Sequence, residues 1–329
     1  MKKIILLVVS MMLIFSMSGC TGKEPLESIE VKVAGLKGPS SIGMIQMIDQ
    51  QASLGENVST TYDIVPAPDT LVAKLLNGEY DFATLPTNTA SIIYNKTGEY
   101  QVAGIATWGM LYVVVNGVEI NDWSDFEGKK VYPFAQGSTP DIIFKYLLEK
   151  NGVNAQNVDI DYSLQQAELT QALTAGKVSV AVLPEPFVTA ATMQNKNLKI
   201  IMNIQEEWKK VHMTSSVIPA EAAYPMTAIV VKKEFAEKFP EVVSNYLKLY
   251  ETSIDWVKDN PSDAALLIEK HDLGLAAKAA ENAIPRSNIR LERTKNCKNK
   301  IEFYLNVYNG FSPQAIGGKM PDENFYYGK

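Results

Sequence analysis

Two stretches of this chain repeat one another at a constant spacing of 98 residues. Residues 71–88 read LVAKLLNGEYDFATLPTN, and residues 169–186 read LTQALTAGKVSVAVLPEP. In both copies, leucines four positions apart share one helical face, and a glycine follows where helices commonly end in the left-handed conformation. Mainly apolar residues then run to a proline, which is typical of a buried parallel strand. The strand ends at the proline because proline has no backbone N–H to donate to a neighbouring strand. The chain is therefore expected to contain one helix–strand unit twice.

The repeat extends upstream of these units. Residues 31–34 predict a strand that runs into a loop at 38–41, and residues 131–134 predict one that runs into a loop at 136–140. With the apolar helices that follow, each half reads as an open parallel α/β sheet. A chain of 329 residues is also longer than one core usually serves. We predict an α/β fold of two doubly wound, Rossmann-like lobes, with ligand-binding loops beyond the carboxyl ends of the strands.

The first residues indicate export. Two lysines at positions 2 and 3 precede apolar runs at 4–9 and 11–15, which is the pattern of a secretory signal and is shorter than the about 20 residues of a membrane span. The segment Met17-Ser18-Gly19-Cys20 resembles the bacterial lipobox. That resemblance implies removal of residues 1–19, lipid on Cys20 and a polar tether over residues 20–28. The protein would then be anchored outside the cytoplasm, on the outer face of one membrane or on the periplasmic side. The alternative is an ordinary signal peptide followed by a chance cysteine.

Composition narrows the function further. The formal net charge is −6 and no block of like charge stands out, so no basic surface for nucleic acid is expected. Cys297 is the only cysteine besides Cys20, which leaves it no partner for a disulfide within the mature chain. We expect a free thiol there and no cofactor.

Three segments carry a family likeness. Residues 71–86 resemble the L-x-x-G-x-x-D-x-A-x-x-P region of type II periplasmic binding proteins, and residues 123–131 look like the D-L-x-G-K-x-V start of their second lobe. Residues 183–187 look like the E-P turn of the branch that serves taurine, alkanesulfonates, nitrate and the pyrimidine precursors of thiamine. The resemblance implies a monomeric solute-binding protein whose lobes close on a small molecule and deliver it to an ABC permease in the membrane.

The same resemblance implies where the chain passes between lobes. Hinge segments are expected at residues 113–117 and 220–226. The first lobe would comprise residues 29–112 and 227–329, and the second residues 118–219.

The loops expected at the cleft supply candidate ligand contacts. Hydroxyls at helix starts either cap the helix or reach a ligand, an asparagine both donates and accepts, and aromatic rings either stack on a flat ligand or pack in the core. The candidates are Ser40, Ser41, Thr87, Asn88, Trp108, Gln136, Ser138, Thr139, Glu185 and Tyr224.

Glu185 and the scarcity of arginine bear on the ligand. A carboxylate between two prolines that faced the cleft would favour a cationic or amidine-like solute, and the alternative is a solvated or lobe-bridging glutamate. The arginines are Arg286, Arg290 and Arg293, outside the predicted loops, so no bidentate grip on a sulfonate is expected. With Trp108, this favours an aminopyrimidine thiamine precursor. The alternative is an organic sulfonate or nitrate-like anion, because helix N-termini alone can hold anions.

An enzyme and a ligand-free lipoprotein are the two alternatives to a solute-binding role. Relatives of this fold in fungi and other eukaryotes make the thiamine pyrimidine with a lysine-bound pyridoxal cofactor, a sacrificial histidine and a cysteine-rich loop. This chain has only His212 and His271, no cysteine cluster and no metal-ligand spacing, so we expect no enzyme. The remaining alternative is a sensor or structural lipoprotein that binds no small molecule.

Overall fold

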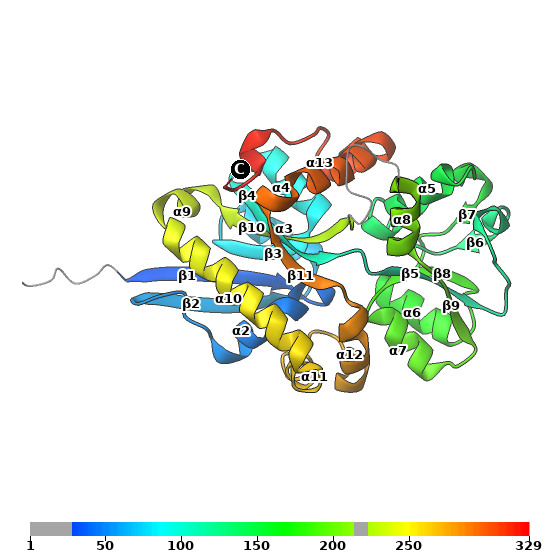
Figure 1. The fold of residues 1–329 in the computed structure, drawn as a ribbon, viewed down its shortest axis with the longest axis horizontal. Coiled ribbons are helices and arrows are strands. Elements are labelled where there is room, and N and C mark those ends of the chain that lie inside the picture. Colours follow the sequence, from blue (N-terminus) through cyan, green and yellow to red (C-terminus); the bar gives the residue numbers. More distant parts are fainter. Residues whose placement is uncertain (1–27, 214–222, 329) are drawn as a thin grey trace, which may run out of the picture.

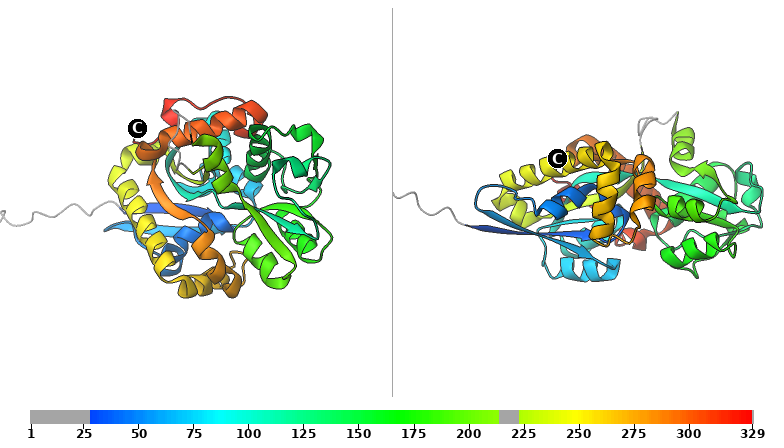
Figure 2. Two further views of the ribbon diagram at one scale, coloured as in Figure 1. Left: turned by 45° about the vertical axis from the view of Figure 1, so that its right-hand side comes forward. Right: turned by 90° about the horizontal axis from the view of Figure 1, so that it is seen from below.

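The computed structural model describes residues 28–213 and 223–328, and these form two α/β lobes that lie side by side along the long axis of the molecule (Figures 1 and 2). The predicted signal peptide, Cys20 and nearly all of the tether lie outside the described residues, as do positions 220–222 of the predicted second hinge segment. Within the described part of the chain, no helix combines the length and apolar character needed to cross a membrane.

The first lobe contains a six-stranded mixed sheet in the order β11-β4-β10-β3-β1-β2. Strands β1 to β4 run parallel to one another, while β10 and β11 run antiparallel to their neighbours. The register of the β1–β2 pair extends from Ile29 opposite Val58 to Leu36 opposite Val65. The strands are β1 (Ile29–Leu36), β2 (Val58–Val65), β3 (Phe82–Pro86), β4 (Tyr100–Trp108), β10 (Pro225–Lys232) and β11 (Ile289–Arg293).

The second lobe repeats this order. Its sheets run β8-β5-β9 and β6-β7, and a parallel bridge between Tyr132 and Ala181 joins them. The combined order β7-β6-β8-β5-β9 corresponds to β2-β1-β3-β10-β4, with β5 and β10 as the antiparallel members. The strands are β5 (Leu111–Asn116), β6 (Lys130–Val131), β7 (Asp159–Ile160), β8 (Val180–Pro184) and β9 (Leu198–Asn203).

The helices cover the faces of both sheets (Figure 2). In the first lobe these are the 3-10 helices η1 (Pro39–Met44) and η4 (Ile284–Arg286) with α2 (Ile45–Gln50), α3 (Pro68–Leu76), α4 (Thr87–Thr97), α9 (Lys233–Lys238), α10 (Pro240–Asp259), α11 (Pro261–Lys270), α12 (Ala277–Ala283) and α13 (Thr294–Phe311). The second lobe has α5 (Thr139–Lys150), α6 (Gln166–Thr174), α7 (Phe187–Gln194) and α8 (Ile204–His212).

The sequence repeat is reproduced element by element. Helix α3 and strand β3 begin at Pro68 and Phe82, while α6 and β8 begin 98 residues later at Gln166 and Val180. The ends of these elements keep the same spacing. The two-lobed α/β class predicted from the repeat is confirmed.

The chain crosses between lobes earlier than predicted. Val113 pairs with Val182 of β8 and Met202 of β9, so the expected hinge at residues 113–117 lies mainly inside a central strand of the second lobe. The run Val113–Val115 is buried, which explains why it forms a strand rather than a hinge. The crossing consists of Gly109 and Met110, between β4 and β5. At the second crossing, Pro225 and Met226 already belong to β10.

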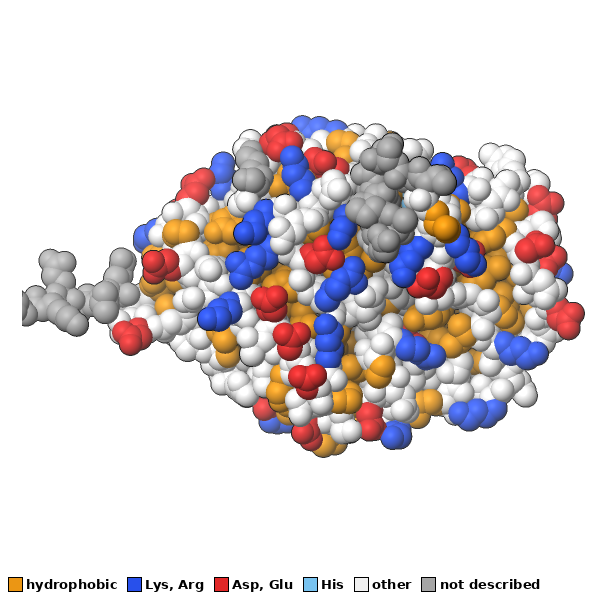
Figure 3. Space-filling view, in the orientation of Figure 1, with side chains coloured by type: hydrophobic (Ala, Val, Ile, Leu, Met, Phe, Trp, Pro, Cys, Tyr) orange, Lys and Arg blue, Asp and Glu red, His pale blue; other side chains and the backbone are white. Residues whose placement is uncertain are grey.

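The surface carries mixed charge. On the face shown in Figure 3, acidic and basic side chains are interspersed, without a continuous basic area.

Candidate functional site

A cleft of about 390 Å³ lies between the lobes, where strand ends and helix starts of both meet. Much of its lining is stiff and apolar: six prolines contribute, together with Met110, Phe134 and Met226. The polar part of the lining consists of Lys37, Ser40, Asn88, Thr89, Ser138, Thr139, Gln166 and Thr227. Such a surface suits a small molecule with an apolar body and few polar groups.

Helix starts surround this cleft. The first or second residues of α3, α4, α5 and α6 contribute to its lining, through Pro68, Asn88, Thr139 with Pro140, and Gln166. The first backbone N–H groups of a helix have no partner within the helix, and the aligned peptide dipoles place partial positive charge there. Two helices from each lobe therefore direct positive potential toward one space.

The side-chain charge of the cleft has the same sign. Lys37 is the only charged residue among the described residues that line it, and no aspartate or glutamate does. Its Nζ lies 2.6 Å from Asp272 Oδ2, at the rim, and the lysine side chain is 31% exposed. Because this ammonium is already paired, it is the helix starts, together with the absence of a carboxylate from the described lining, that make the cleft better suited to an anionic or neutral group than to a cation.

Four of the predicted contacts line the main cleft. They are Ser40, Asn88, Ser138 and Thr139. Ser40 and Ser138 are equivalent positions of the repeat, and the Ser138 Oγ is buried without a hydrogen-bond partner in the described structure. The Asn88 Nδ2 donates to the carbonyl of Ala315 at 3.1 Å, which orients its side-chain amide.

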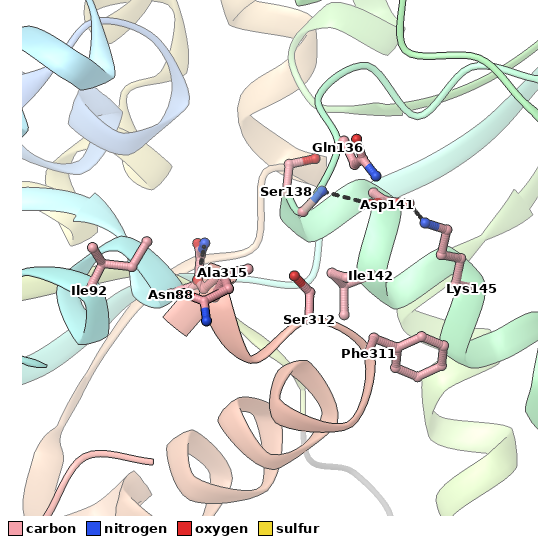
Figure 4. A pocket seen from close by; sticks show the side chains of 12 residues that line it. Asn88, Ile92, Gln136, Ser138, Asp141, Ile142, Lys145, Phe311, Ser312 and Ala315 are labelled. Atoms are coloured by element: carbon pink, nitrogen blue, oxygen red, sulfur yellow. Dashed lines mark hydrogen bonds and ion pairs between the residues drawn. The ribbon is translucent and has the colours of Figure 1, made fainter. Parts of the chain in front are cut away.

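A second cavity adjoins the first. It measures about 570 Å³ and lies between α4, α5 and the residues that follow α13 (Figure 4). Asn88 and Ser138 line both cavities, so these two residues stand at the boundary between them. Gln136, the fifth predicted contact, lines this second cavity.

Three of the remaining predicted residues line neither cavity. Ser41 is buried and donates to the Leu36 carbonyl at 2.8 Å. Thr87 is fully buried behind the start of α4. Trp108 is fully buried too, and its Nε1 donates to the Arg290 carbonyl at 3.2 Å. Each side chain turns back into its own lobe, because neighbouring residues at a helix start or strand end point in different directions.

Tyr224 is a packing residue at the second crossing. Its side chain is fully buried, and its hydroxyl accepts from the Leu111 N–H at 3.4 Å. Burial raises the pKa of this phenol well above its ordinary value. It therefore packs between the two crossing strands and lines neither cavity, which is the packing alternative rather than the ligand contact.

Glu185 does not line either cavity. It is fully buried, its carboxylate lies 2.5 Å from Arg286 Nη2, and it accepts from the Thr189 N–H at 3.0 Å. Burial raises the pKa of Glu185, while the charge of Arg286 opposes that rise. The glutamate bridges the lobes instead of facing the solute, so the argument for a cationic ligand no longer holds.

The sequence interpretation missed several lining residues. Lys37 immediately precedes the Gly38 loop and was a visible signal, as a lone cation beside a helix start. Phe134 adopts a φ of 51°, which is rare for an aromatic residue and common at functional sites. Met110, Met226 and Thr227 reach the cleft only because the two crossing segments meet at its floor.

Comparisons with known proteins agree with this architecture. The family model described as NMT1/THI5 like matches residues 62–264. The binding protein YtlA of Bacillus subtilis is 21% identical over 259 residues, which span 76% of this chain and 72% of YtlA.

Solved structures give the same result. An ABC transporter structure from Parabacteroides distasonis is 26% identical, with a TM-score of 0.75 and coverage of 91% of this chain and 99% of that one. The periplasmic aliphatic sulphonate binding protein SsuA of Escherichia coli is 15% identical, with a TM-score of 0.68 and coverage of 90% and 94%. The periplasmic nitrate-binding protein NrtA of Synechocystis is 12% identical, with a TM-score of 0.62 and coverage of 88% and 84%. The chain therefore belongs to the NMT1/THI5-like family and is a type II periplasmic binding protein of an ABC importer.

Proposed function

We propose that this protein captures a small organic anion between its lobes and delivers it to an ABC permease, while lipid on Cys20 holds it at the membrane. The observation that carries the choice of ligand is the charge of the main cleft. Four helix starts surround it, the one charged side chain in its described lining is Lys37, a cation paired with Asp272, and no carboxylate is found among those lining residues. Hydrogen-bond donors with positive potential are the features that hold anions at helix N-termini.

This choice replaces the aminopyrimidine as the favoured ligand. The pyrimidine hypothesis relied on Glu185 to bind an amidine-like edge and on Trp108 to stack on the ring, and both side chains are fully buried away from the cleft. The apolar prolines and methionines of the cleft favour an organic anion over nitrate, because a wholly polar ion would leave them without contacts.

Transport requires the lobes to move. We expect an open form to bind solute and a closed form to be recognised by the permease, driven by tighter binding to the closed form. The crossing at Gly109 and Met110 is short, and Met110 itself lines the cleft. A monomer with two lipid chains or more would stay near the permease, since one acyl chain gives only marginal anchoring.

Both histidines are engaged in hydrogen bonds outside the two cavities. His212 stacks on Tyr146, its Nδ1–H donates to the Trp208 carbonyl at 2.7 Å, and its Nε2 accepts from the Tyr146 hydroxyl at 2.7 Å. His271 pairs with Asp49 at 2.8 Å. Neither lines the two cavities between the lobes, and the described residues contain no group of three or more potential metal ligands.

The test is a thermal-shift panel on the protein that begins at Cys20→Ser. The panel contains taurine, alkanesulfonates, short carboxylates, nitrate and aminopyrimidines. A ligand at about 100 times its dissociation constant adds about 2.7 kcal/mol, which raises the midpoint by several degrees. We expect organic anions to raise the midpoint in this way, and we expect the Lys37→Gln substitution to reduce that increase.

Lys210→Gln is the matched control, because its Nζ also lies 2.6 Å from a carboxylate, that of Glu207, and it does not line either cavity. Stabilisation by aminopyrimidines alone would overturn the anion assignment and leave the transport role. Stabilisation by nothing, together with no co-purified solute in native mass spectrometry, would favour the sensor alternative.

A further inference from the structure

We propose that the solute site continues past Asn88 and Ser138 into the second cavity, so that the preferred solute is an anion with a neutral extension bearing amide or hydroxyl groups. This inference rests on the proposed function, because it takes the anionic end of the solute to lie in the main cleft. It adds the second chamber, defined by Gln136, Ile142, Phe311, Ser312 and Gln314 with the shared pair Asn88 and Ser138.

The two spaces meet at residues that belong to both. Asn88 stands at the start of α4 in the first lobe, and Ser138 is the residue before α5 in the second. In Figure 4, Ser312 lies between these two helices, and Gln136 stands beyond Ser138. A solute bound at the main cleft can therefore extend between Asn88 and Ser138 while still contacting both lobes.

The second chamber offers no spare charge. Its only charged residues among the described lining are Asp141 and Lys145, which pair with each other at 2.8 Å. Asp141 is 1% exposed and also accepts from the Gly137 N–H at 2.7 Å and the Tyr162 hydroxyl at 2.8 Å. Because the carboxylate is fully engaged, a second ionic group on the solute would be desolvated without a partner. The extension that fits is neutral.

Hydrogen-bonding groups line the same chamber. Gln136 and Gln314 contribute exposed side-chain amides, and Ser312 contributes a hydroxyl. At the boundary between the two cavities, the Ser138 Oγ is buried without a partner, which is a cost that a hydrogen bond from a solute would remove. Ile142 and Phe311 supply apolar walls for a linking alkyl segment. Amide and hydroxyl groups on a short alkyl chain match this lining.

The chamber wall is also held rigidly. The turn after α13 docks on α4 through the Ser91 hydroxyl, which donates to the Ile316 carbonyl at 2.8 Å, and through the Asn95 amide, which donates to the same carbonyl at 2.8 Å. Gly317 has a φ of 89°, and a Cβ there would lie 2.9 Å from that of Asn95. A wall placed this firmly can discriminate solutes by length, because it costs little to organise on binding.

The experiment compares three sulfonates of increasing length by isothermal titration calorimetry. They are ethanesulfonate, N-acetyltaurine and N-(N-acetyl-β-alanyl)taurine, which each carry one sulfonate and no ammonium group and add a neutral amide tail of increasing length. We expect the longest to bind about tenfold more tightly than ethanesulfonate, as one or two additional net hydrogen bonds would provide. In Ser312→Phe, which fills the chamber, the ratio of the two affinities should fall to about one.

Gln136→Leu combined with Gln314→Leu is the second variant, because both side chains are exposed and their replacement spares the core. It should reduce the same ratio even if Ser312→Phe folds poorly. Gln156→Leu, an exposed glutamine of the second lobe that lines neither cavity, should keep the ratio of the unmodified protein. Equal affinities for all three sulfonates, or a ratio that survives both variants, would overturn the second chamber and leave the anion cleft. Failure of every sulfonate, and of the short carboxylates of the thermal-shift panel, to bind would overturn both.

Discussion

The carboxylate of Glu185 lies 2.5 Å from the guanidinium of Arg286, and this ion pair joins two lobes. Glu185 follows β8 of the second lobe, whereas Arg286 ends η4, which precedes β11 of the first. Arg286 Nη2 also donates to the Thr189 hydroxyl at 2.6 Å. The glutamate is fully buried, while the arginine side chain is 40% exposed. The contact between the lobes at this point is therefore an ion pair between a buried carboxylate and a partly exposed guanidinium.

Removing Arg286 should destabilise the protein more than neutralising Glu185. Arg286→Met leaves a buried carboxylate without its cation, and breaking a buried pair costs about 3–5 kcal/mol, which the partial exposure of this arginine reduces to roughly 2 kcal/mol. Glu185→Gln removes the charge that needs compensation and should cost less. Urea unfolding midpoints at neutral pH measure both. Equal effects of the two substitutions would show that the buried charge is not the cause.

The pH dependence of stability should reveal His212. Burial lowers the pKa of this imidazole below its ordinary value of 6.5. In the range below 6.5 the unfolded chain therefore binds a proton that the folded protein does not, and stability falls as the pH falls, by at most about 1.4 kcal/mol per pH unit. His212→Asn should flatten the slope of unfolding free energy against pH between 6.5 and 5. Parallel curves for the two proteins would contradict this assignment.

Sequence patterns predicted what depends on near neighbours along the chain. The repeat led to both sheets and to Ser40 and Ser138 at one cleft, because periodicity and turn chemistry determine local elements. The side-chain partners were not predictable in this way. Glu185 and Trp108 appeared available for a ligand, and the fold brings Arg286 and Arg290 against them from the C-terminal part of the chain. Such contacts join residues that are far apart in the sequence, so local sequence patterns do not predict them.

The glycine at the first crossing should be indispensable. A Cβ on Gly109 would lie 2.6 Å from the Tyr224 ring and closer still to the side-chain oxygen of Gln205. Gly109→Ala should therefore destabilise by about 1–3 kcal/mol, the usual cost of overpacking. Gly310→Ala is the control, and it should stabilise the protein instead. Nothing lies within 4 Å of a Cβ at this position of α13, so alanine should raise the unfolding free energy by about 0.5–1 kcal/mol. Calorimetric midpoints report both.

A smaller side chain tests the cause of the Gly109 effect. Gln205→Ala removes the nearest obstacle, so the Gly109→Ala substitution should cost less in that background than alone. Strict additivity of the two substitutions would show that the collision with Gln205 does not contribute.

Ser138 and Thr139 are adjacent in sequence, but substitution of Ser138 should lower solute affinity, whereas substitution of Thr139 should lower stability. The Thr139 hydroxyl lies 2.8 Å from the Tyr304 hydroxyl and accepts from Tyr308 at 3.1 Å, inside the contact between α5 and α13. Thr139→Val keeps the shape but removes these bonds, and should cost about 1–2 kcal/mol, because buried tyrosine hydroxyls lose a partner. Ser138→Ala removes a hydroxyl that has no partner in the described structure, so unfolding free energy should change little while solute affinity falls. Unfolding and titration on both variants separate the two roles, and a large loss of stability in Ser138→Ala would place its hydroxyl in the fold rather than in the site.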